Sequence, residues 1–194
     1  MALDWPEVRE WRKAERERLL ALRRDMTAEA RHAAADAIGR TVEDVVRTRK
    51  ARSFGGYWPI KAELDFRALF TRLAEAGVTV ALPVIVEPKT PLEYWRWLPG
   101  AKMERGFWNI PVPAQRDVVH PDLVIAPLIG FDPACYRLGY GGGYFDRTLA
   151  SLEPRPYAVG VGLEATRLQT IHPQPHDIPM ASIVTERGLV HSRD

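Results

Sequence analysis

The chain has 194 residues, of which 46% are hydrophobic and 27% are charged, a composition typical of one globular domain, here spanning residues 1–194. The lone cysteine, Cys135, excludes a disulfide-stapled secreted scaffold and favours a reducing compartment, so we expect a cytoplasmic protein. No apolar run reaches the length of a membrane span, and a net charge of +2 is too balanced to attract nucleic acid or a membrane through the overall field. We therefore expect neither of these partners. The protein is also expected to be a monomer.

Long helices are expected in the first third of the chain, because no proline occurs between Pro6 and Pro59. A first helix is predicted over residues 5–24. A second helix is predicted to begin near Thr27, a suitable N-cap, and to carry its small and apolar residues on one side.

The rest of the chain alternates strand patterns with short helical ones. Strands are predicted over residues 51–57, 78–83, 92–98, 123–128, 158–163 and 182–184, and helices over residues 65–76 and 144–152. Residues 123–126 are apolar without alternation, which is typical of a strand covered on both faces. The pattern predicts an α/β fold: a three-layer α/β/α sandwich with a Rossmann-like, mostly parallel sheet and N-terminal helices. The proline-rich residues 83–121 predict long loops and a hairpin beside a site.

The densest motif is the glycine segment, defined here as residues 137–147, with four glycines in five positions from Gly139 to Gly143. Glycines let backbone N–H groups converge on a ligand, and the following helix N-terminus favours an anion, so phosphate is the expected ligand. A merely flexible loop is the alternative. Neither a dinucleotide fingerprint nor a Walker loop fits, because Tyr144 stands where each motif requires glycine.

Charged residues near this segment suit a nucleotide. Asp146 could hold Mg²⁺ against phosphates, or could simply complement the helix dipole. Arg12 and Arg16 are four residues apart and therefore share one helix face, where two guanidinium groups could hold phosphate oxygens or form surface salt bridges.

The segment RLGYGGGYFDR resembles the signature of the 5-formyltetrahydrofolate cyclo-ligases, also called methenyltetrahydrofolate synthetases. The family usually has a second tyrosine where this chain has Phe145. Three more blocks follow the family's order, namely the basic pair at residues 12 and 16, YWPIKAELD at residues 57–65, and PHD at residues 175–177. The resemblance extends from about residue 12 to residue 185.

The resemblance implies that ATP and 5-formyltetrahydrofolate are converted into 5,10-methenyltetrahydrofolate, ADP and phosphate, with Mg²⁺ required. In the implied mechanism the formyl oxygen attacks the γ-phosphoryl group, N10 closes on the activated carbon, and phosphate leaves. Positioning and charge neutralisation would supply most of the catalysis in such a phosphoryl transfer.

The resemblance also implies the site residues. Arg137 and Tyr144 are the expected catalytic residues, and Asp146 and Asp177 the expected Mg²⁺ ligands. The expected ATP-binding residues are Arg12, Lys13, Arg16, Arg137, Leu138, Gly139, Tyr140, Gly141, Gly142, Gly143, Tyr144 and Phe145. The expected folate-binding residues are Trp58, Glu63, Trp108, Gly141, Gly142, Gly143 and Tyr144. A flat pterin suits an aromatic wall and a carboxylate acceptor, although a tryptophan at a strand end is more often a core residue.

The sequence leaves the roles of some basic residues and the choice between competing functions open. The first basic residue of the pair is commonly lysine in the family, so either Arg12 or the adjacent Lys13 could reach phosphate. The basic candidates for the folate tail are Lys61, Lys89, Lys102 and Arg105. A non-catalytic folate- or nucleotide-binding paralogue and a nucleic-acid-binding protein are the competing functions.

Overall fold

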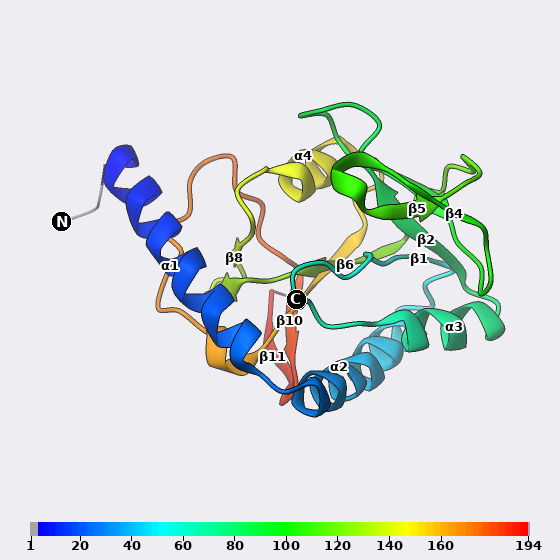
Figure 1. The fold of residues 1–194 in the computed structure, drawn as a ribbon, viewed down its shortest axis with the longest axis horizontal. Coiled ribbons are helices and arrows are strands. Elements are labelled where there is room, and N and C mark those ends of the chain that lie inside the picture. Colours follow the sequence, from blue (N-terminus) through cyan, green and yellow to red (C-terminus); the bar gives the residue numbers. More distant parts are fainter. Residues whose placement is uncertain (1–3, 194) are drawn as a thin grey trace.

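A seven-stranded sheet with helices on both faces forms the centre of the computed structural model, which describes residues 4–193 (Figure 1). Its strand order is β11-β10-β9-β6-β1-β2-β3. The five inner strands are parallel, and the two edge strands are antiparallel. The bounds are β1 (Ser53–Gly55), β2 (Thr79–Val84), β3 (Glu93–Arg96), β6 (Leu123–Pro127), β9 (Tyr157–Val161), β10 (Ser182–Thr185) and β11 (Gly188–Ser192). The predicted mostly parallel α/β fold is confirmed.

Three helices cover the two faces of this sheet. Helices α2 (Ala28–Thr48) and α3 (Arg67–Glu75) lie on one face and α4 (Tyr144–Ser151) on the other (Figure 1). The reason is chirality, because right-handed crossovers that run in opposite directions along the sheet place their helices on opposite faces. The connection from β1 to β2 through α3 runs one way, and that from β6 to β9 through α4 runs the other way.

The first helix, α1 (Trp5–Asp25), packs beside the sheet on segments that follow its strands. It begins with a capping box in which Asp4 and Glu7 exchange side-chain and backbone hydrogen bonds. Its buried Leu19 packs with Ile129, Leu138 and Ile171. Helix α1 therefore lies along the ends of the strands, where ligands bind in such folds.

Short elements complete the fold. They are β4 (Met103–Arg105) and β5 (Pro111–Pro113), which pair as a hairpin, β7 (Gly130–Phe131) and β8 (Arg137–Leu138), which pair as another, and the 3₁₀ turns η1 (Phe107–Asn109) and η2 (Glu164–Thr166). The predicted hairpin within residues 83–121 is confirmed. Strand β11 was not predicted, and neither were the two-residue strands β7 and β8, which are too short to leave a periodic pattern.

Two predicted boundaries differ from the structure. The strand predicted over residues 51–57 is shorter, Ser53–Gly55, although the Gly56 backbone N–H still donates to the Ala81 carbonyl of β2 at 2.9 Å. The helix predicted over residues 65–76 begins at Arg67, since the Asp65 carboxylate accepts the Arg67 backbone N–H at 3.0 Å before the first turn.

Strand order reverses between β1 and β6, since β1 connects onward to β2 on one side while the chain later returns through β6 on the other. At such a switch point the loops leaving the carboxyl ends of the two strands diverge and leave a crevice. The topology thus places a crevice next to Gly56 and the residues after Pro127.

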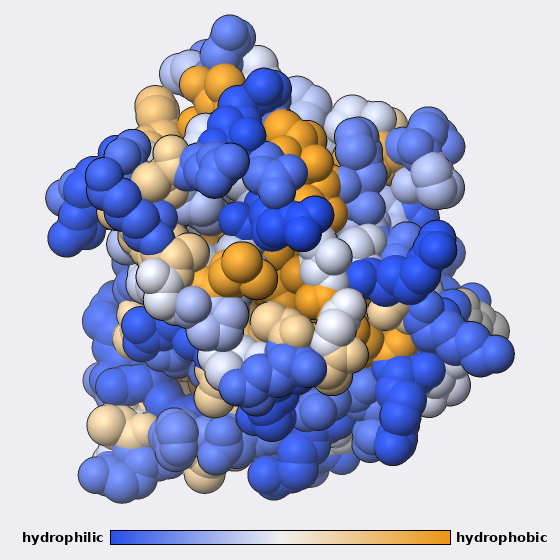
Figure 2. Space-filling model, turned by 90° about the vertical axis from the view of Figure 1, so that its right-hand side faces the viewer, coloured by the Kyte–Doolittle hydropathy of each residue, from blue (hydrophilic) through white to orange (hydrophobic). Residues whose placement is uncertain are grey.

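The side that carries α3 and the β4–β5 hairpin is mainly hydrophilic, with apolar residues gathered near its centre (Figure 2). Within residues 4–193, no helix combines the length and apolar character needed to cross a bilayer.

Two glycine-to-alanine substitutions should have opposite effects on stability. A Cβ at Gly56 would collide with the buried Phe70 ring, so Gly56→Ala should reduce the free energy of unfolding by about 1–3 kcal/mol. A Cβ at Gly39, inside α2, would meet its nearest neighbours at 3.7 and 3.8 Å, so Gly39→Ala should raise stability by about 0.5–1 kcal/mol. Urea denaturation measures both changes; equal signs would contradict the packing described for Gly56.

Candidate functional site

A cleft of about 1190 Å³ opens at the switch point. Its walls come from α1, from the residues after β1 and β2, from the η1 turn, and from the glycine segment with the start of α4. The structure brings the following predicted site residues to this one cleft: Arg12, Lys13, Arg16, Trp58, Glu63, Trp108, the whole run from Arg137 to Asp146, and Asp177.

Arg12 is held by the loop of residues 171–177. Its Nε donates to the Ile171 carbonyl at 3.0 Å and its Nη2 to the His172 carbonyl at 3.0 Å. Nη2 also forms an ion pair of 2.5 Å with Asp177, whose pKa lies below its usual value because hydrogen bonds from Arg12 and the Gln174 backbone outweigh its burial. The buried guanidinium group of Arg12 therefore donates its hydrogen bonds to other groups of the protein.

Lys13 has a different environment, since its side chain is exposed and lines the cleft. Among residues 4–193 it has no hydrogen bond or ion pair, which leaves its ammonium group available for a ligand. Arg12 and Lys13, which the sequence did not distinguish, thus differ in the structure: Arg12 is bonded to the protein, and Lys13 faces the cleft.

Arg16 joins α1 to the glycine segment. Its Nε donates to the Gly139 carbonyl at 2.7 Å, and its guanidinium lies 3.4 Å from where a Cβ on Gly141 would stand. Burial, and secondarily the nearby Arg12, lowers the pKa of Arg16 below its usual value, which still leaves it a cation at neutral pH.

The glycines of the segment meet two requirements. Gly141 (φ +91°) and Gly143 (φ +65°) have left-handed backbone conformations, and Gly143 is the N-cap of α4. Left-handed residues alternating with others form the concave backbone that binds anions. The second requirement is space for neighbouring arginines. A side chain added to the glycine would meet a guanidinium group at three positions: Arg137 at Gly139, Arg16 at Gly141 and Arg147 at Gly143.

Arg137 and Asp146 form a partly buried ion pair of 2.8 Å at the start of α4. The second Asp146 oxygen accepts the Ile178 backbone N–H at 3.1 Å, which places Asp146 beside the loop that carries Asp177. Arg137 also stacks 5.0 Å from the centre of the Phe145 ring, which packs against the core. Phe145 thus fills a packing position beside Arg137.

The two carboxylates offer oxygen ligands of the kind that Mg²⁺ prefers. Each Asp146 oxygen accepts one hydrogen bond, so each keeps a lone pair, and the side chain is 18% exposed. Within residues 4–193 no group of three or more acidic, histidine or cysteine side chains is placed to share a metal. The residues fit an ion held by one or two carboxylates and completed by phosphates and water.

Aromatic side chains form the opposite wall. Trp108 is 64% exposed, and its ring stands edge-on to that of Tyr144, with centroids 5.7 Å apart. Trp58 is half-buried, packs partly against the core, and has the Arg67 guanidinium 5.1 Å from its ring. Both tryptophans line the cleft, although Trp58 also contributes to the core.

Glu63 is buried, with 8% of its surface exposed, behind a tight turn. Its Oε2 accepts the Ile60 backbone N–H at 2.9 Å, while Lys61 and Ala62 have positive φ angles of 48° and 59°. Burial raises the pKa of Glu63, and the Ile60 hydrogen bond, Arg23, Tyr140 and Lys61 oppose that rise. Two strained non-glycine residues in succession indicate that the position of this carboxylate is strongly constrained.

Sequence reasoning missed Arg23 and Arg147, and did not separate Lys61 from the other basic candidates. Lys61 lines the cleft, whereas Lys89, Lys102 and Arg105, all described by the structure, do not. Arg23 follows Arg16 by seven residues on one helix stripe, a spacing that could have identified it.

Known proteins resemble this chain along most of its length. The model of the 5-formyltetrahydrofolate cyclo-ligase family matches residues 8–186. A protein of that name from Haemophilus influenzae is 27% identical over 171 residues, 84% of this chain and 91% of the relative. Another, from Mycolicibacterium smegmatis, is 30% identical over 151 residues, 73% and 78% of the two chains. The solved structure of Aquifex aeolicus 5,10-methenyltetrahydrofolate synthetase has a TM-score of 0.81 at 26% identity, covering 94% of this chain and 93% of the other.

Replacing Asp177 should cost stability in a pH-dependent way. Asp177→Asn leaves the buried Arg12 without its anion, and we expect a loss of about 2 kcal/mol at pH 7. Because folding lowers the Asp177 pKa, the stabilisation is present above its ordinary value of 3.8 and is lost as the pH falls through the lowered value. The gap between wild type and variant, measured by urea denaturation, should therefore narrow below pH 3.8.

Asp44→Asn is the matched control, because Asp44 forms an exposed pair with Arg47 on α2. It should change stability by less than about 0.5 kcal/mol. A loss at Asp177 that persists unchanged at low pH would refute the charge-based account of the Arg12 contact.

Proposed function

Because the chain belongs to the 5-formyltetrahydrofolate cyclo-ligase family, we propose that it converts 5-formyltetrahydrofolate and ATP into 5,10-methenyltetrahydrofolate, ADP and phosphate. The observation that carries this proposal is one cleft with two chemically different walls. A basic, glycine-rich wall suits phosphates, and an aromatic wall with a buried carboxylate suits a pterin. The reaction needs both ligands in contact, and both walls meet at Tyr144.

ATP binds along the basic wall. Lys13, Arg16 and Arg137 face the phosphates, and backbone N–H groups of residues 137–145 complete the cradle. Arg12 contributes its charge and holds the 171–177 loop at the rim of the cleft. Leu138 contributes through its backbone, since its side chain is buried under α1.

Mg²⁺ would be held by Asp146, with Asp177 nearby, and would neutralise phosphate charge when bound. Its remaining ligands would be phosphate oxygens and water, consistent with the few acidic groups at this end of the cleft. Asp146 also orients Arg137 through their ion pair.

The folate binds at the aromatic wall. Trp58 and Trp108 flank the pterin, and Glu63 accepts hydrogen bonds from its ring N–H groups. Lys61 is placed at the same wall, where its ammonium group suits a carboxylate of the folate tail. Tyr144 lies between the two ligands and positions the formyl group.

The chemistry then needs little beyond positioning. The formyl oxygen forms a bond to the γ-phosphorus while the bond from that phosphorus to the oxygen retained by ADP breaks. N10 next attacks the formyl carbon and loses its proton, and the carbon–oxygen bond breaks to release phosphate. Arg137 stabilises negative charge on the transferred phosphoryl group throughout.

The direct test mixes purified protein with 5-formyltetrahydrofolate, Mg²⁺ and ATP and follows the near-ultraviolet absorbance of the conjugated methenyl product. We expect absorbance growth that requires ATP and yields one ADP per product. Absent turnover, with binding of both ligands still measurable by calorimetry, would instead identify a non-catalytic binding protein.

Arg16→Gln should impair ATP use more than folate use. The variant loses a cation that lies against Gly139 and Gly141, so the KM for ATP should rise about tenfold or more. The KM for 5-formyltetrahydrofolate should change much less. Arg18→Gln is the control, because Arg18 lies on the exposed side of α1 and pairs with Glu15. Equal increases in both KM values for Arg16→Gln would contradict its assignment to the nucleotide wall.

A further inference from the structure

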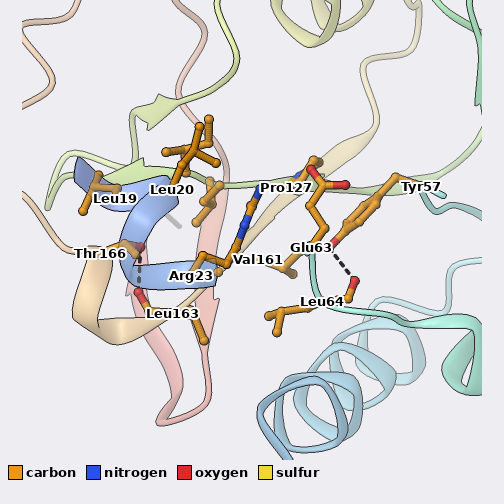
Figure 3. Close-up of a pocket in the computed structure, with 13 residues that line it drawn as sticks. Leu19, Leu20, Arg23, Tyr57, Glu63, Leu64, Pro127, Val161, Leu163 and Thr166 are labelled. Atoms are coloured by element: carbon orange, nitrogen blue, oxygen red, sulfur yellow. Dashed lines mark hydrogen bonds between the residues drawn. The ribbon is translucent and has the colours of Figure 1, made fainter. Parts of the chain in front are cut away.

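Arg23 is a buried cation without a role in the reaction described above. Only 6% of its surface is exposed, and it lies on the inner side of α1. It lines a cavity of about 10 Å³ together with Glu63 and Tyr57, and Figure 3 shows these three side chains around the same space. Because Glu63 and Tyr57 also line the large cleft, Arg23 stands directly behind the folate-facing wall.

Arg23 makes two specific hydrogen bonds there. Its Nη2 donates to the Lys61 carbonyl at 2.9 Å and to the Tyr140 hydroxyl oxygen at 2.5 Å. Its Nε is buried and has no hydrogen-bond partner among the described residues. The guanidinium group of Arg23 thus hydrogen-bonds both the strained turn before Glu63 and the glycine segment.

The contact with Tyr140 fixes the direction of a proton. A guanidinium group has no acceptor, so the Tyr140 oxygen can only accept from Arg23 and its single proton must point elsewhere. The Glu63 carboxylate, an acceptor when ionised, lines the same cleft as Tyr140, and the Tyr140 hydroxyl lowers the Glu63 pKa, as a proton directed at that carboxylate would. Burial chiefly, together with the Glu63 charge, raises the pKa of Tyr140 to about 12, so the hydroxyl keeps its proton at neutral pH.

The other groups facing Glu63 do not replace this arrangement. Tyr57 donates its hydroxyl to the Leu64 carbonyl at 3.0 Å. Lys61 directs its ammonium group over the Tyr140 ring, 5.2 Å from the centre, and its side chain is exposed. Arg23 is therefore the buried cation opposing the burial of the Glu63 charge.

We propose that Arg23 is a positioning residue: by holding the Tyr140 hydroxyl and the turn before Glu63, it directs the Tyr140 proton to the folate-binding carboxylate. Because Tyr140 belongs to the glycine segment, the same hydrogen bonds tie the folate wall to the nucleotide wall. The effect on Glu63 is a property of the ligand-free protein, and only its consequence for folate rests on the proposed function.

The first test measures the Glu63 pKa directly, in ligand-free protein labelled with ¹³C at the glutamate carboxyl, with Glu63→Gln used to assign the NMR signal. Arg23→Leu should raise the Glu63 pKa by about one unit or more. Arg24→Leu is the matched control, since Arg24 is the exposed neighbour on α1, and it should leave the pKa unchanged. An unchanged Glu63 pKa in Arg23→Leu would overturn the proposal.

The second test measures binding of 5-formyltetrahydrofolate against pH without nucleotide. In Arg23→Leu the pH below which affinity is lost should shift upward, and the KM for folate should rise more than kcat falls. Arg23→Lys keeps the charge but not the fork, so it should restore part of the shift. A merely structural role would lower affinity equally at every pH.

Tyr140→Phe keeps the proposal testable if Arg23→Leu does not fold. It removes the hydroxyl alone and should raise the Glu63 pKa in the same direction; no rise would overturn the proton-directing role. The two proposals fail separately, because a shifted Glu63 pKa without methenyl production would contradict only the reaction. Methenyl production with an unshifted pKa would contradict only the role of Arg23.

Discussion

The cleft depends on three arginines of α1 that hydrogen-bond segments far away in the sequence, from 38 residues for Lys61 to 160 residues for His172. Arg12 holds the 171–177 loop, Arg16 holds the glycine segment, and Arg23 holds the turn before Glu63. Each of these arginines donates a hydrogen bond to at least one backbone carbonyl. Such bonds satisfy a buried guanidinium group, so the three arginines do not each need a carboxylate partner. The planar fork matters here, because a lysine could not bridge two acceptors with fixed geometry. One helix stripe thereby aligns three separate loops around one cavity.

This construction makes the basic wall preorganised. Its arginines, Arg12, Arg16 and Arg137, are held by the protein before any ligand arrives, so little reorganisation is needed when phosphate charge enters the cleft. The glycine segment accepts this crowding only because three of its residues lack a side chain where a guanidinium lies. The strained turn at Lys61 and Ala62 is maintained for the same reason, since Arg23 and Glu63 hold it from two sides.

Sequence patterns predicted what depends on local periodicity. The two long helices, the inner strands and the glycine segment were all found, and the ordered motifs correctly predicted the family. Patterns could not show that Arg12 faces Asp177, because that partner lies 165 residues further along the chain. Arg23 was missed although it shares the helix stripe of Arg16, since an arginine in a charge-rich helix resembles its solvated neighbours. Strand β11 was missed because an exposed edge strand needs only half of its side chains to be apolar.

The position of α1 also has a consequence for how the protein is made. This helix is synthesised before the sheet, yet the partners of Arg12 belong to a loop between β9 and β10. Contacts so distant in sequence carry a large loop-closure entropy and form late. During synthesis the arginines of α1 therefore stay solvated at first. The cleft is complete only after β10, the last parallel strand in chain order, joins the sheet. Competence to bind a nucleotide would then mark the completion of folding, and a chain truncated before residue 171 would lack it.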